Sequence, residues 1–105
     1  MRLAAILPFF FAGLGLVRAI DERLLYTIPA GDTIDTFTSD FESTCATWAP
    51  AIAAGLTSEA SLVEPGDFSG ANADTEARIY CTWTHGTTIV PFTTEVAASL
   101  GATEA

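Results

Sequence analysis

The chain contains no lysine, and positive charge is scarce throughout it. Its 105 residues hold four arginines against 13 acidic side chains, which gives a formal net charge of −9 at pH 7. Lysine and arginine are the side chains that bind phosphate backbones and anionic membrane surfaces. We therefore expect no nucleic-acid partner and no anionic-membrane partner, whereas a basic protein surface would be electrostatically favourable. The alternative, which we favour, is that the charge only keeps the protein soluble and monomeric.

Groups that build catalytic or metal sites are equally sparse. His85 is the only imidazole, and no Gly-x-Ser-x-Gly or comparable nucleophile motif accompanies it. Carboxylates are numerous, but no spacing singles out a pair for glycoside hydrolysis. One loop could offer oxygen ligands to calcium, from Asp67, Asn72, Asp74 and Glu76. It lacks the alternating acidic positions and the central glycine of a helix-loop-helix calcium site, so we do not expect it to bind calcium. We expect a protein that is not an enzyme and that holds no metal and no cofactor.

Long hydrophobic runs are absent except at the N-terminus. Met1-Arg2 is followed by a nearly continuous apolar segment from Leu3 to Val17, and Val17-Arg18-Ala19 has the form of a signal-peptidase site. The apolar segment is interrupted by proline and glycine and is shorter than the roughly 20 residues that cross a bilayer. The sequence therefore predicts a signal peptide at residues 1–19. Residues 20–105 would form a single small secreted domain, extracellular and free of the membrane.

Cysteine is limited to two residues. Cys45 and Cys81 show neither CxxC spacing nor a neighbouring cluster of histidines or cysteines, which argues against a redox or zinc site. Thiols of exported proteins are oxidised in the compartment that they enter. We therefore expect one structural disulfide between Cys45 and Cys81.

The clearest periodic pattern in the chain is helical. Apolar residues recur at steps of three and four, as on one side of a helix, at Ile34, Phe37, Phe41, Cys45, Trp48 and Ile52. Two starts are compatible with this pattern, a cap at Asp32 or the capping box formed by Ser39 and Glu42. Pro50 lies inside the pattern, so we expect a kink or a break near Trp48.

Strands are predicted on either side of this helix. They are expected at residues 24–28 and 60–63 and, after a loop from Glu64 to Glu76, at residues 77–84. The last segment alternates, which places Ile79, Cys81 and Trp83 on one apolar face.

A hairpin and a short helix are expected to complete the chain. His85-Gly86 is predicted to be a two-residue loop leading into residues 87–90, because glycine suits the positive φ that such a loop requires. Thr93 is predicted to cap a final helix whose apolar face holds Val96, Ala97 and Leu100.

Together these elements follow the order β-α-β-β-β-α. Cys45 lies on the apolar side of the helix and Cys81 on the apolar face of a strand, so their disulfide would join helix to sheet. The sequence thus predicts an α+β fold, a small two-layer sandwich. One long helix and a short C-terminal helix would pack on an antiparallel sheet, held by one disulfide.

Two aromatic residues are candidates for contact with a partner. Phe68 lies in a polar loop, and Tyr80 lies on the outer face of a predicted strand, where exposed aromatic side chains mark contact points. The alternative is that each of them packs against the domain's own surface. Trp48 and Trp83 instead fall on faces assigned to the core, beside the disulfide.

The composition and layout of the chain are similar to those of the small secreted proteins of filamentous fungi, some of which act as effectors on a host. This resemblance implies a secreted, non-enzymatic interaction or structural module with an unknown protein partner. In its order of elements the chain also resembles the inhibitor or propeptide domains of subtilisin-like proteases, which implies a protease inhibitor as the alternative. Those domains present a C-terminal tail to the protease cleft, whereas residues 101–105 form a short tail without an inhibitor motif.

Overall fold

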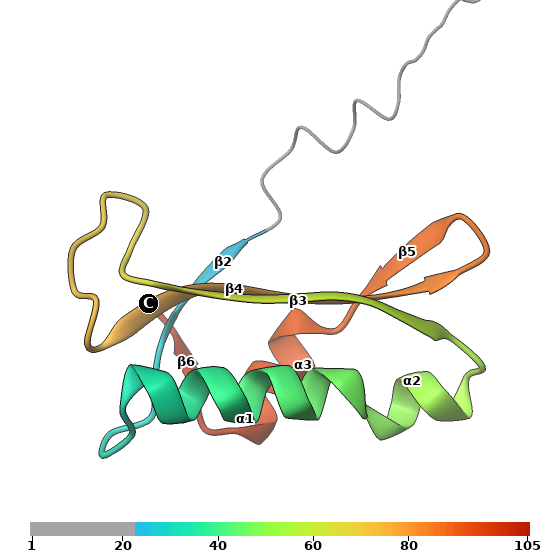
Figure 1. Ribbon diagram of the computed structural model, residues 1–105, viewed down its shortest axis with the longest axis horizontal. Coiled ribbons are helices and arrows are strands. Elements are labelled where there is room, and N and C mark those ends of the chain that lie inside the picture. Colours follow the sequence, from blue (N-terminus) through green and yellow to red (C-terminus); the bar gives the residue numbers. More distant parts are fainter. Residues whose placement is uncertain (1–22) are drawn as a thin grey trace, which may run out of the picture.

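The computed structural model describes residues 23–105, and the predicted signal peptide at residues 1–19 lies outside them. A five-stranded antiparallel sheet forms one layer and the helices form the other (Figure 1). The predicted α+β fold is therefore confirmed. Within the described residues, no helix has the length and apolar character needed to cross a membrane.

The elements follow the predicted order with one addition at the end. Their bounds are β2 (Leu24–Thr27), α1 (Ile34–Ala46), α2 (Ala49–Ala53), β3 (Thr57–Pro65), β4 (Glu76–His85), β5 (Thr88–Pro91), α3 (Thr93–Ser99) and β6 (Thr103–Glu104). The sheet has the order β3-β4-β2-β6, and β5 also pairs with β4. Strand β6 was not predicted; it consists of two residues paired with β2.

Helix α1 begins at neither of the two predicted starts. The side chain of Thr33 accepts a hydrogen bond from the backbone N–H of Thr36 and caps the helix. Ser39 and Glu42 therefore lie in the helix interior rather than in a capping box. The earlier start is favoured because Phe37, in the turn before Ser39, is fully buried and reaches the core from a helical position.

The predicted break near Trp48 is confirmed, and it corrects one assignment beyond it. Helix α1 ends at Ala46, and Pro50 lies in the first turn of α2, where its missing N–H costs no hydrogen bond. The apolar side of the helix does not continue in phase across the break. Ile52 was predicted to face the core but is 56% exposed, and Ala51 is buried in its place.

The core lies between the sheet and the helices and contains the disulfide. Cys45 of α1 and Cys81 of β4 are joined, with their Cα atoms 5.8 Å apart. Trp83 packs nearby, and its indole N–H donates a hydrogen bond of 3.0 Å to the carbonyl of Cys45. As the sequence predicted, Ile79, Cys81 and Trp83 form the buried face of β4 and the disulfide joins helix to sheet. Trp48 is half-buried and packs against this core.

The loop between β3 and β4 is fixed by its own side chains. Gly66 has a φ of +91°, and a Cβ atom at this position would lie 3.1 Å from the carbonyl oxygen of Ala71. A carboxylate oxygen of Asp67 accepts hydrogen bonds from the Ser69 hydroxyl and from the backbone N–H groups of Ser69 and Ala71. These bonds, first among them the one from the Ser69 hydroxyl, hold the pKa of Asp67 below its usual range. The loop therefore has a defined shape with an ionised carboxylate at its centre.

The predicted hairpin between β4 and β5 is present, but its loop is shifted by one residue. His85 still belongs to β4 and pairs with Thr88, so Gly86 and Thr87 make the turn. Gly86 has a φ of +65°, as required for this type of turn.

Candidate functional site

Within residues 23–105, the three helices lie on one side of the sheet, and no described element covers the other side (Figure 1). Residues directly opposite each other in antiparallel strands share a face. On the uncovered side, Tyr80 of β4 lies opposite Leu62 of β3, and Thr82 lies between Ala60 and Pro91. We call this side the outer face and define it by Leu25, Thr57, Ala60, Leu62, Glu64, Arg78, Tyr80, Thr82, Thr84, Ile89 and Pro91.

The centre of the outer face is more apolar than is usual for an uncovered sheet. Antiparallel sheets with one solvated side normally carry polar residues on that side. Here the central positions are aliphatic or aromatic and half-buried, namely Leu25, Ala60, Leu62, Tyr80 and Ile89. Contiguous apolar surface of this kind marks binding sites on soluble proteins.

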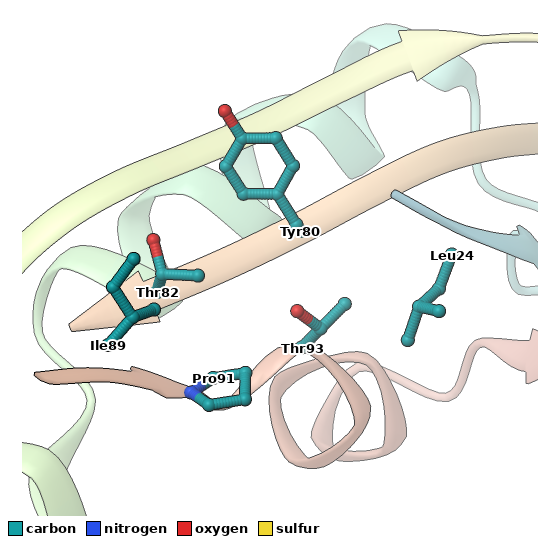
Figure 2. A pocket seen from close by; sticks show the side chains of 6 residues that line it. All are labelled: Leu24, Tyr80, Thr82, Ile89, Pro91 and Thr93. Atoms are coloured by element: carbon teal, nitrogen blue, oxygen red, sulfur yellow. The ribbon is translucent and has the colours of Figure 1, made fainter. Parts of the chain in front are cut away.

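A pocket of about 390 Å³ opens beside this apolar area. Four of its six lining residues belong to the outer face, whereas Leu24 lies opposite Ile79 and Thr93 begins α3. The pocket forms because two strands share one edge of β4. Strand β2 pairs with residues 76–79 and β5 pairs with residues 82–85, so a gap remains between them. Figure 2 shows the side chains around this hollow, which belong to Leu24, Tyr80, Thr82, Ile89, Pro91 and Thr93.

The backbone in the gap is closed by α3 and the residue before it. The N–H of Cys81 donates to the Thr93 hydroxyl at 2.9 Å, and the carbonyl of Cys81 accepts from the N–H of Phe92 at 2.8 Å. Thr93 was predicted to cap α3, but that prediction is wrong, because Phe92 is the cap residue and the Thr93 hydroxyl is engaged by β4. With the groups of Cys81 satisfied, the pocket is suited to a side chain rather than to an added strand.

One carboxylate is hydrogen-bonded to a residue that lines the pocket. The pairing of β3 with β4 shifts between Ser58 and Ala60, and this bulge makes Glu59 an extra residue. A Glu59 carboxylate oxygen accepts a hydrogen bond of 2.9 Å from the hydroxyl of Thr82, a pocket residue that is only 2% exposed. None of the six lining residues carries a charge, and Glu59 is a charged residue that contacts one of them, Thr82. Glu59 was not predicted as a site residue, because a bulge depends on strand pairing and leaves no periodic signal in the sequence.

The other end of the outer face holds the two arginines of the described chain. Arg23 pairs with Glu64, and its guanidinium lies over the ring of Phe68, 5.5 Å from the ring centre. Arg78 donates to the carbonyls of Pro65 and Gly66 at 2.8 and 3.1 Å and lies 3.6 Å from the same Glu64 carboxylate. Glu64 thus partly neutralises both arginines.

The two aromatic residues predicted for partner contact occupy different parts of this surface. Tyr80 lines the pocket and is half-buried. Phe68 is 56% exposed and is linked to the arginine end through its contact with Arg23. His85 is exposed at the end of β4, and no group of three His, Cys, Asp or Glu residues within residues 23–105 is placed to hold a metal ion.

Comparison of the chain with protein-family models, with curated proteins and with solved structures gave no match.

Proposed function

We propose that this protein is a secreted, non-enzymatic interaction module that binds another protein through the outer face of its sheet. The observation that carries the proposal is the pocket beside an apolar sheet surface that no helix of the described residues covers. Tyr80 is the expected central contact, because aromatic residues in partly desolvated pockets dominate protein interfaces. Phe68 is the expected contact at the arginine end.

The edges of the sheet are less suitable for binding than its outer face. Exposed strand edges pair with other chains unless they are short, bulged or interrupted by proline. Strand β3 has the bulge at Glu59 and ends at Pro65, and β6 has only two residues. Strand β5 has four residues and ends at Pro91. A partner is therefore expected to contact side chains rather than extend the sheet.

The inhibitor alternative receives less support from the arrangement of the tail. Thr103 and Glu104 pair with β2, and the N–H of Ala105 donates to the carbonyl of Leu25. Residues held in the sheet in this way are not available to enter a protease cleft. We therefore favour the interaction module over the protease inhibitor.

Secretion is part of the proposal and can be tested by mass analysis of extracellular material. The disulfide and the apolar segment of residues 3–17 support it. We expect a chain that begins at Ile20 and is two hydrogens lighter than its reduced form. An intact N-terminus or two free thiols would contradict the proposed localisation.

The binding face can be tested by changing one apolar side chain in each layer. Leu62→Thr alters the outer face and keeps a residue that favours strands, whereas Ile52→Thr removes an exposed aliphatic side chain from the helical layer. Each variant is immobilised and exposed to extracellular fluid beside the parent protein. We expect the Ile52 variant to retain the partner, and the Leu62 variant to lose affinity by about tenfold.

Thermal unfolding of both variants serves as the control for this experiment. Melting temperatures near that of the parent would show that the comparison reports binding rather than folding. Equal capture by the two variants would contradict the assignment of the outer face as the interface.

A further inference from the structure

This inference depends on the proposed function and specifies the chemistry of the partner. We propose that the pocket of the outer face receives an arginine or lysine side chain from a basic segment of the partner protein. The aliphatic stem of that side chain packs between Leu24, Ile89 and Pro91, and its charged end meets the carboxylate of Glu59.

The shape and lining of the pocket suit a long side chain with an apolar stem. At about 390 Å³ the pocket has room for such a side chain and part of the chain that bears it. Leu24, Ile89, Pro91 and the ring of Tyr80 supply apolar walls. Arginine and lysine bury their methylene stems along surfaces of this kind while the charged head stays at the rim.

Glu59 is held in place before any partner binds. Its hydrogen bond with Thr82 restricts the carboxylate, so less side-chain freedom is lost when a cation arrives. The carboxylate retains acceptor capacity beyond that single bond and can form a charge-assisted hydrogen bond with a guanidinium or an ammonium group. The face of the Tyr80 ring offers a second favourable contact for a cation.

The overall charge of the molecule favours a basic partner over the other occupants. The chain carries a net charge of −9, so a second copy or a phosphate-bearing ligand would be repelled at long range. The arginines that could attract an acidic partner lie at the other end of the outer face and are paired with Glu64. The charged group that contacts a lining residue of the pocket is the negative carboxylate of Glu59, which is hydrogen-bonded to Thr82.

The test uses matched peptides and the isotope-labelled secreted protein. The probes are acetyl-Gly-Gly-X-Gly-Gly-amide peptides in which X is arginine or citrulline, which has nearly the same shape without the charge. NMR titration follows the methyl resonances of Leu24 and Ile89. We expect saturable shifts of both with the arginine peptide, and about fivefold to tenfold weaker binding of the citrulline peptide.

Two isosteric variants distinguish the effect of the Glu59 carboxylate from the effect of the protein's overall negative charge. Glu59→Gln keeps an oxygen that accepts from Thr82, so the rim retains its structure. Glu42→Gln makes the same change of charge at an exposed position of α1, in the other layer. We expect Glu59→Gln to weaken binding of the arginine peptide by about fivefold to tenfold, and Glu42→Gln to change it by less than about twofold.

Four outcomes of these titrations would contradict the proposal. Equal affinity for the arginine and citrulline peptides, or equal losses in the two variants, would overturn the proposed role of Glu59. Shifts of the Leu24 and Ile89 methyl groups on simple concentration of the protein would assign the pocket to a second copy and overturn the proposal. The absence of any shift with either peptide would also overturn it. In all of these cases the Leu62→Thr capture experiment still decides separately whether the outer face is an interface.

Discussion

Replacing both Cys45 and Cys81 by alanine is expected to lower the free energy of unfolding by about 4 kcal/mol. The two residues are 36 positions apart, so the disulfide strongly restricts the unfolded chain, and the half-cystines are at most 1% exposed. Small domains have total stabilities of about 5 to 15 kcal/mol, so this loss would leave a marginally stable protein. Urea denaturation measures the change directly.

Tryptophan fluorescence emission measures how the double cysteine substitution changes the packing of the core. Trp83 is 3% exposed and donates to the carbonyl of Cys45, so loosening of α1 should shift its emission to longer wavelength. The parent protein with its disulfide reduced is the control, because it loses the covalent link without losing the sulfur atoms. A double variant that melts within a few degrees of the parent with unchanged emission would show that the disulfide does not hold α1 on β4.

The second large effect is expected from Phe41→Ala, with a loss of about 3 to 5 kcal/mol. Phe41 is fully buried, and its ring centre lies 5.8 Å from that of Phe37 one turn earlier in α1. Truncation would leave a cavity between helix and sheet that the surrounding side chains fill only in part. Thermal or urea unfolding measures the loss.

Ile52→Ala is the matched control for Phe41→Ala. Ile52 also lies on the helical layer but is 56% exposed, so its truncation should change stability by about 0.5 kcal/mol or less. Similar losses for the two substitutions would mean that the core does not lie under α1.

The sequence predicted those parts of the fold that depend on a periodic pattern of apolar residues within a single helix or strand. The helical period placed Phe37, Phe41 and Cys45 on one side of α1, and alternation placed Cys81 on the inner face of β4. The prediction that the disulfide joins helix to sheet followed from those two positions. Ile52 was assigned wrongly because the break after α1 changes the rotation of α2 relative to α1. A periodic pattern contains no information about that rotation.

The candidate site was less predictable because it depends on how separate strands align. Tyr80 was recognised from alternation within β4 alone. The pocket beside it exists because β2 and β5 stop at different points along the same edge, and Glu59 is an extra residue of β3 that bonds to Thr82 because the strand has a bulge. Neither property is encoded in a local pattern. Thr93 was similarly misassigned, because its buried hydrogen bond to Cys81 competes with the local capping role.

The close approach at Gly66 has a consequence for recognising related chains. A side chain at this position would meet the backbone of Gly70 and Ala71 in a conformation with positive φ, so substitution would distort the entry to the loop. Asp67 follows at once and anchors the loop with its carboxylate. A related chain that forms the same loop is therefore expected to keep glycine at the position of Gly66.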